Sequence, residues 1–415
     1  MNLAERRWLR LVTLCALFFA QGIPWGFFSI TLIGYMSEPS RGFGVGAIGS
    51  VFAMSYWPYV FKWVWGPAID TFTIARFGRR RPWIVFAQAM MAASAAALLF
   101  VRDLAASFDL VVVLILVHTT FNAMQNVAVD GLAIDLLDPG ERGRANGFMY
   151  GSKYAGGIVG GAGLGWVTAR WSIHAALAIQ AIALAAIVAL PVLVRERSGP
   201  PPARPPAREI ARALGRVLRL RSPIVAAAAM LAANLAGAML NVIAPLLYEG
   251  KLGWSQERYT GVVGGPGLLV GFLGSMLCGL FADKLGVRRL AALASIALGV
   301  AWLGFAAGER YWNDEWFVYT LAVIEPLTQS IMIVALWSLC MSVSLKRTAA
   351  TQFAAYTSLT SLSTILGARV LAGCAYDWWD FRTIYVIAGL AQIATIALLP
   401  LIDPDQVRRE LPHET

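Results

Sequence analysis

Apolar stretches of about twenty residues recur along nearly the whole chain, and they restrict the possible folds more than any other feature. A helix that crosses the hydrocarbon core of a bilayer needs about 20 mostly apolar residues. Hydrophobic residues make up 58% of the 415 and charged residues only 14%, whereas soluble domains carry roughly 25% charged residues. Too few polar side chains remain to cover a surface exposed to water. The sequence therefore predicts an all-α integral membrane protein.

Breaks in hydropathy at turn and charge clusters predict twelve transmembrane helices. Their approximate ranges are 9–36, 45–69, 82–101, 108–137, 145–169, 172–194, 223–248, 257–282, 288–307, 316–344, 350–375 and 381–402. The fourth and the tenth are long, as is typical of helices that tilt or extend beyond the hydrocarbon. We expect an N-terminal six-helix bundle at 1–194 and a C-terminal six-helix bundle at 223–415.

The only long polar break, "RERSGPPPARPPAREIARALGRVLRLRS" at 195–222, separates the two predicted bundles. Its proline run predicts an extended linker. The section "REIARALGRVLRL" places apolar residues on one helix face with arginines around it, which fits a helix lying on the inner membrane surface. A solvated basic connector fits the same residues.

The basic residues predict the orientation of the chain. Of its 34 lysines and arginines, 24 fall in one set of connecting segments, seven in the opposite set and three within spans. Because cytoplasmic loops carry the excess of basic residues, both termini are expected in the cytoplasm of a multi-pass protein of the cytoplasmic (inner) membrane. The net charge of +10 then faces anionic lipid. No nucleic-acid partner is inferred, and a monomer suffices. The basic start of the chain lacks a small-residue cleavage site, so it is interpreted as an uncleaved first span.

Motifs for catalysis are missing from the sequence. The four cysteines form no CxxC pair and the three histidines are scattered, so neither a metal site nor a cofactor is predicted. The chain has no HExxH, GxSxG or Walker motif. These observations argue against a membrane enzyme and against a self-contained ATP-driven pump.

Two motifs occur in both halves of the chain. "GPAIDTFTIARFGRRR" (66–81) follows the second span and "GLFADKLGVRR" (279–289) follows the eighth, each with the pattern Gly-x-x-x-Asp and then Gly and arginines. "ERGRANGFMYGSKYAGG" opens the fifth span and "LKRTAATQFAAYTSL" opens the eleventh. Such pairs indicate an internal repeat of six helices.

The repeated pattern resembles the signature of the major facilitator superfamily. The match is specific in "ADKLGVRR" and departs in the first half, where Thr71 replaces the basic residue. The resemblance implies a secondary transporter whose two six-helix bundles rock about a central cavity.

Two further segments are similar to one branch of that superfamily. "PYVFKWVWGPAID" and "QNVAVDGLAIDLLDPGERGRANG" resemble the AmpG-type muropeptide permeases and the related acetyl-CoA transporters. AmpG-type permeases carry two additional spans between their bundles, and this chain has only the 28-residue break there.

Charged residues at helix ends form a candidate cytoplasmic gate. Asp70 and Asp283 each lie beside an arginine cluster, which fits either an ionic latch or a turn-forming structural role. The candidate gate residues are Asp70, Arg79, Arg80, Asp135, Asp283 and Arg288.

Charged residues also lie inside the predicted spans: Lys62, Asp130, Lys153, Glu325 and Arg369. A charge at the bilayer centre costs about 2.5–3.5 kcal/mol on insertion scales, so these groups must pair or face water. The helical rise places Lys62, Asp130 and Lys153 at a common depth, roughly 10–13 Å from the predicted inner ends of their spans. Both Lys62 and Arg369 could instead extend toward lipid headgroups.

We hypothesise that Asp130 lies near Lys62 and Lys153 in a water-filled cavity, and that Glu325 pairs with Arg369. Asp130 or Glu325 is then the group that binds the coupling proton. Pro24, in "AQGIPWG", predicts a break or a simple kink in the first span. The candidate substrate-binding and coupling residues are Gln21, Lys62, Asn122, Gln125, Asn126, Asp130, Lys153, Asn234, Asn241, Glu325 and Arg369.

The function that these features favour is proton-coupled import of an amphiphilic anionic solute by alternating access. The resemblance ranks muropeptide-like glycopeptides first among substrates. A siderophore, acyl-CoA or drug transporter of the same fold is the alternative, and a membrane receptor or scaffold without transport is the alternative of another class.

Overall fold

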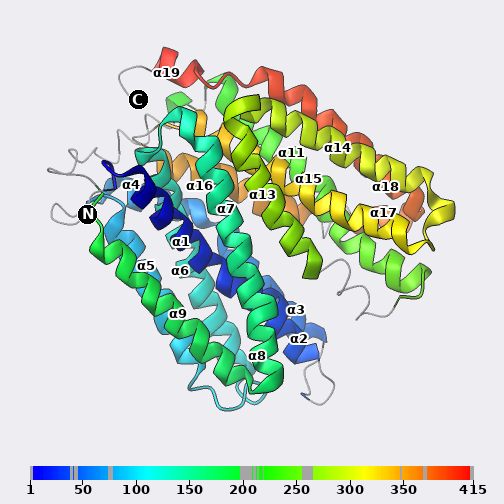
Figure 1. Ribbon diagram of the computed structural model, residues 1–415, viewed down its shortest axis with the longest axis horizontal. Helices are drawn as coiled ribbons and strands as arrows, with labels where there is room; N and C mark the ends of the chain where they lie inside the picture. Colours follow the sequence, from blue (N-terminus) through cyan, green and yellow to red (C-terminus); the bar gives the residue numbers. More distant parts are fainter. Residues whose placement is uncertain are drawn as a thin grey trace. The chain divides into compact units, whose positions relative to one another are not determined.

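The computed structural model describes residues 3–37, 41, 45–72, 78–196, 208, 212, 215–217, 219–254, 265–345, 348–367 and 372–411. Within these residues the chain is a succession of helices (Figure 1). Seven of the described helices are long and apolar enough to cross a membrane, and Pro266–Ala282 is a shorter apolar helix.

Each of the six spans predicted for the first half corresponds to helical structure. In chain order the elements are α1 (Arg7–Gly26), the π-helix η1 (Phe27–Thr31), α2 (Leu32–Ser37), α3 (Val45–Val60), the 3-10 helix η3 (Lys62–Val64), α4 (Trp65–Thr71), α5 (Arg81–Leu98), α6 (Phe108–Leu136), α7 (Arg142–Ile158), the π-helix η5 (Val159–Gly163), α8 (Leu164–Arg170) and α9 (Ile173–Leu193).

The six spans of the second half also correspond to helices. The elements are α11 (Arg221–Pro245), the π-helix η6 (Leu246–Lys251), α13 (Gly265–Leu285), α14 (Val287–Ala307), α15 (Glu315–Ser342), α16 (Ala349–Ile365), α17 (Ala372–Trp378), α18 (Phe381–Ala394) and the 3-10 helix η11 (Thr395–Leu401), followed by α19 (Gln406–Glu410). The predicted fold class is therefore confirmed. Of the polar break, Arg208, Arg212 and Gly215–Val217 are helical, and most of its other residues lie outside the described ones.

Prolines modify two of the helices without ending them. α1 continues past Pro24 and widens into η1, so the break suggested by the sequence is a local change of helix type. Pro58 lies in α3 and has no N–H for the carbonyl of Met54, one turn earlier. The hydroxyl of Thr119 on α6 lies 3.0 Å from that carbonyl and can donate to it. This contact offers a donor from a neighbouring helix, and the same hydroxyl also lies 2.8 Å from the carbonyl of Ile115 in its own helix.

The chain divides into two compact units. Unit 1 comprises residues 1–137, 152–214 and 345–355, and unit 2 comprises 138–151, 215–344 and 356–415. Each unit therefore includes a short segment from the other half of the sequence. These two segments belong to the repeated motifs that open the fifth and eleventh spans. The predicted boundaries at 194 and 223 stay a prediction.

Within unit 1, α1 packs closely against α7 and η5 through glycines. A Cβ atom added at Gly160 would lie 1.9 Å from the carbonyl oxygen of Ile23, and one added at Gly22 would lie 2.0 Å from that of Lys153. The hydroxyl of Thr31 lies within hydrogen-bond distance of the Gly160 carbonyl, at 2.8 Å. Small residues thus allow two backbones to approach directly, as at many helix contacts in membranes.

Other helices of each unit pack side by side. In unit 1, α5 contacts both α6 and α9 (Figure 1). In unit 2, α14 contacts α15 and α18, and Trp312 donates its indole N–H to the carbonyl of Phe305 over 2.8 Å. These packed helices provide the rigid frame that holds the polar side chains described below.

We predict that Gly160→Ala destabilises the protein, because the new methyl group would meet backbone that cannot turn aside. Overpacking of this kind costs about 1–3 kcal/mol. The matched control is Gly34→Ala, where an added Cβ meets no atom within 4 Å. Thermal unfolding of the purified protein in detergent checks the difference. Equal unfolding temperatures for the two variants would contradict the prediction.

Candidate functional site

Lys62 begins a buried series of hydrogen bonds in unit 1. It lies where α3 has ended and η3 begins, and only 4% of the residue is exposed. Its Nζ donates to Asn126 Oδ1 on α6 over 2.7 Å. Asn126 Nδ2 donates to Gln21 Oε1 on α1 over 3.1 Å, and Gln21 Nε2 donates to Gln125 Oε1 over 2.7 Å.

The series continues to two more helices. Gln125 Nε2 donates to Gln88 Oε1 on α5, and Gln88 Nε2 donates to the carbonyl of Leu184 on α9 over 3.0 Å. We call Asn126, Gln21, Gln125 and Gln88 the amide chain. All four side chains are buried.

The two ends of the amide chain determine the orientation of every amide in it. An ammonium group only donates hydrogen bonds, so Asn126 must present its oxygen to Lys62. The nitrogen of Asn126 then faces Gln21, and the same reasoning passes from one amide to the next. A backbone carbonyl only accepts, which matches the donor that the last amide presents to Leu184.

Asp130 is buried beside this series without a hydrogen bond of its own. The residue is 0% exposed, and neither carboxylate oxygen has a hydrogen-bond partner among the described residues. It interacts electrostatically with both Lys62 and Lys153. Asn122, which precedes Asp130 by about two helical turns in α6, also has a buried oxygen without a partner among the described residues. Because such burial is costly, these atoms indicate a place for a proton, water or ligand.

The structure places the second-half candidates in unit 2. Asn234 donates to the carbonyl of Met230 in its own helix over 2.9 Å, and Asn241 is exposed. Glu325 is half-buried on α15 and interacts with the buried indole of Trp302. Arg369 lies outside the described residues, so its pairing with Glu325 stays a prediction.

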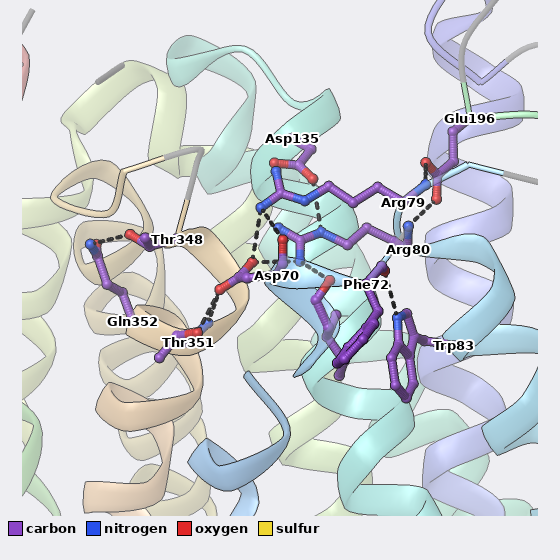
Figure 2. A network of polar contacts seen from close by, with 11 residues as sticks. Asp70, Phe72, Arg79, Arg80, Trp83, Asp135, Glu196, Thr348, Thr351 and Gln352 are labelled. Carbon is purple, nitrogen blue, oxygen red and sulfur yellow. Dashed lines mark hydrogen bonds and ion pairs between the residues drawn. The ribbon is translucent and has the colours of Figure 1, made fainter. Parts of the chain in front are cut away.

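Asp70 lies at the centre of a second polar cluster, which also belongs to unit 1 (Figure 2). Its Oδ1 is 2.6 Å from Arg80 Nη1 and 3.2 Å from Arg79 Nη2. Its Oδ2 accepts from the backbone N–H of Thr351 over 2.8 Å and from the hydroxyl of Thr351 over 2.6 Å. Thr351 is in the first turn of α16, where backbone N–H groups have no partner within the helix.

Arg80 links Asp70 to α6. Its Nε donates to Asp135 Oδ2 over 2.9 Å, and its Nη1 is 3.3 Å from the carbonyl of Ile69. Burial alone would lower the pKa of Arg80, but Asp135 and Asp70 together raise that pKa above its ordinary value. Arg80 is therefore a permanent cation between two carboxylates. We call Asp70, Arg79, Arg80, Asp135 and Thr351 the Asp70 network.

Glu196 connects the start of α5 to the end of α9 (Figure 2). Its carboxylate accepts from three consecutive backbone N–H groups, those of Arg79, Arg80 and Arg81. In return, the Arg81 guanidinium donates to carbonyls in the last turn of α9. Burial raises the pKa of Glu196, and the three amides oppose that rise. Each charge thus lies at the helix end whose dipole favours it.

The structure brings four of the six predicted gate residues into the Asp70 network. The side chain of Asp283 lies outside the described ones, and Arg288 lies in the first turn of α14, where it interacts with Asp403. Sequence reasoning missed Gln88, Glu196 and Thr351. Gln88 carried a signal, since it is an amide within an apolar span, whereas the contact of Thr351 with Asp70 joins residues 281 positions apart.

We predict that Asp70→Asn destabilises the fold more than any change at Thr351. Removing one partner of a buried ion pair costs about 3–5 kcal/mol, and here it leaves the fully buried Arg80 with one carboxylate. Thr351→Val removes one hydroxyl donor, an effect of about 1 kcal/mol, and Thr351→Ser keeps the hydroxyl. Thermal unfolding in detergent should rank the variants in that order. A milder effect of Asp70→Asn than of Thr351→Val would contradict it.

Comparisons with known proteins agree with this architecture. The model of the Major Facilitator Superfamily matches residues 11–368. The anhydromuropeptide permease of Escherichia coli K12 is 24% identical over 421 aligned positions, which cover 94% of this chain and 79% of the permease.

Two solved transporters share the fold. The fucose:proton symporter FucP of E. coli superposes with a TM-score of 0.75 at 12% identity, covering 95% of this chain and 98% of the symporter. The human organic anion transporter MFSD10 gives a TM-score of 0.64 at 15% identity, covering 95% and 99%. The family and these relatives are transporters rather than enzymes. From its matched family model, its helical fold and its repeat, this chain belongs to the major facilitator superfamily of membrane transporters.

Proposed function

We propose that the protein imports an amphiphilic anionic solute together with protons, by alternating access. Among the candidate substrates, we rank muropeptide-like glycopeptides first. The observation that carries this proposal is the group formed by buried Asp130, buried Lys62 and half-buried Lys153 within unit 1. Two ammonium groups face one carboxylate that has no other partner among the described residues.

These charges provide a physical basis for coupling. While Asp130 is ionised, it neutralises part of the positive charge of the two lysines. When Asp130 binds a proton, both lysines are available to an anionic substrate, whose affinity rises. By linkage, a bound anion equally favours the protonated form of Asp130. Proton and anion therefore bind together, which is the requirement for symport.

The substrate class is supported by the same charges and by the relatives. Two lysines suit a carboxylate or phosphate, and the amide oxygen of Asn122, which has no hydrogen-bond partner among the described residues, suits a donor of a sugar or peptide group. The similar proteins include an anhydromuropeptide permease and a fucose:proton symporter. Siderophore, acyl-CoA and drug transport stay as alternatives within the fold, and a receptor or scaffold stays as an alternative without transport.

The Asp70 network is proposed as the cytoplasmic gate. Asp70 keeps its ion pairs with Arg79 and Arg80 in its own half of the sequence, while Thr351 comes from the other half. Separation of Thr351 from Asp70 would break two hydrogen bonds and leave the buried carboxylate still paired. The network can therefore open and close without leaving the buried carboxylate of Asp70 without an ion pair.

The proposed function is tested by uptake into proteoliposomes. Labelled muropeptides, siderophores and acyl-CoAs are offered with and without an inward proton gradient. Gradient-dependent accumulation of a muropeptide supports the proposal. Accumulation of another solute class moves the substrate assignment to that class, and failure to accumulate any of them refutes it.

We predict that Asp130→Asn removes the effect of the pH gradient on uptake, because the amide cannot bind and release the coupling proton. Exchange of labelled for unlabelled muropeptide across the membrane should persist. Glu325→Gln is the matched control in unit 2 and should keep gradient-driven accumulation. If Glu325→Gln alone abolishes it, the coupling group is Glu325.

We predict that Lys62→Met and Lys153→Met each weaken binding of the anionic solute by about tenfold or more. The reason is that a hydrogen bond to a charged group contributes about 1.5–3 kcal/mol. Lys251→Met is the control, because Lys251 pairs with Glu309 at an exposed position, 3.0 Å away. The measurement is the concentration that gives half-maximal uptake. An equal effect at Lys251 would contradict the assigned role.

A further inference from the structure

Four aromatic residues of unit 1 form a cluster that the proposed function does not yet use. Trp25 on α1, Tyr56 and Tyr59 on α3, and Tyr154 on α7 are all half-buried. Trp25 Nε1 donates to the hydroxyl of Tyr56 over 3.0 Å. The rings of Trp25 and Tyr154 meet edge to face, with centroids 6.0 Å apart. We call these four residues the aromatic cluster.

The aromatic cluster adjoins the charged group of the proposed site. Lys153 Nζ lies 5.9 Å from the centroid of the Tyr59 ring, within the range of a cation–π contact. Tyr154 directly follows Lys153 in α7. Aromatic faces and a cation that interacts with Asp130 thus lie in one region of unit 1.

A glycine holds the Trp25 ring against α7. A Cβ atom added at Gly157 would lie 2.8 Å from Cζ3 of Trp25. The ring is therefore seated directly on the helix backbone, and its orientation is fixed by that contact and by the hydrogen bond to Tyr56. Such preorganisation lowers the entropy cost of binding a ligand.

The exposure of the cluster differs from that of lipid-facing and core aromatics. On another face of α3 and just beyond it, Trp57 and Phe61 are 50% and 44% exposed, as expected for side chains in lipid. Core rings such as Phe27 are 1% exposed. The cluster lies between these limits and carries polar groups.

We propose that the aromatic cluster binds the sugar ring of a glycosylated anion whose acidic group is held by Lys62 and Lys153. The apolar C–H face of a pyranose stacks on an aromatic ring, and its hydroxyls need donors and acceptors at the ring edge. Tyrosine and tryptophan supply both an apolar face and a polar edge. This inference rests on the proposed function, because it assigns the substrate class of the same site.

Three probes separate the two halves of such a ligand. N-acetylmuramic acid carries a sugar ring and a carboxylate, N-acetylglucosamine carries the ring alone, and lactate carries the carboxylate alone. Dissociation constants are measured by calorimetry with the purified full chain. We expect N-acetylmuramic acid to bind more tightly than either partial probe.

Two variants then test the cluster itself. Tyr154→Leu keeps an apolar side chain but removes the ring. It should raise the dissociation constant of N-acetylmuramic acid by about tenfold, corresponding to about 1.4 kcal/mol, and leave that of lactate unchanged. Tyr154→Phe keeps the ring and should bind N-acetylmuramic acid within about threefold of the parent, or about 0.65 kcal/mol. Lys153→Met should weaken both anions and leave N-acetylglucosamine unchanged.

The subsite is refuted if Tyr154→Leu changes all probes equally or none of them, or if the parent protein binds none of the three. Gradient-driven uptake measured in parallel separates this result from the proposed function. If an anion is taken up regardless of whether it carries a sugar ring, the proposed subsite is wrong and the proposed transport function still holds. If binding depends on the sugar ring but no anion is taken up, the proposed transport function is wrong and the subsite still holds.

Discussion

The buried carboxylate of Asp130 is the constraint on which the rest of this site depends. A charge without hydrogen bonds is unfavourable in a protein interior, so its surroundings have to supply compensation. Lys62 and Lys153 supply it electrostatically. Lys62 is itself held by Asn126, and the amide chain fixes the direction in which Asn126 points. Asp130 is thus linked, through Lys62, to polar side chains on α1, α5 and α6, and it interacts directly with Lys153 on α7.

The Asp70 network solves the same problem differently. Asp70 and Arg80 are both fully buried, but each has several direct partners, so each charge is paired in place, although Arg80 Nη2 has no hydrogen-bond partner among the described residues. Glu196 and Arg81 satisfy the helix ends nearby. We interpret the contrast in functional terms. The directly paired charges of the Asp70 network suit a structural closure, whereas Asp130, which has no hydrogen bond among the described residues, suits a group that gains and loses a ligand.

The sequence predicted the helices well, because membrane spans depend on local apolar length. It also placed Asn122, Asn126 and Asp130 on one face, because spacing by four residues survives in any regular helix. It did not predict the partner of Asp70, since Thr351 is distant in the chain and carries no charge to suggest it. The amide chain was also missed as a unit: its members were visible, but their order depends on which helices become neighbours.

The segment 345–355 has a consequence for how such a chain could have arisen. Asp70 Oδ2 accepts two hydrogen bonds from Thr351, which lies in the second half of the sequence. A protein encoded by the first half alone would lack both, and its carboxylate would be left incomplete. The repeat implies duplication of a shorter gene. A chain that holds both copies of the repeat supplies these two donors to Asp70 within one polypeptide.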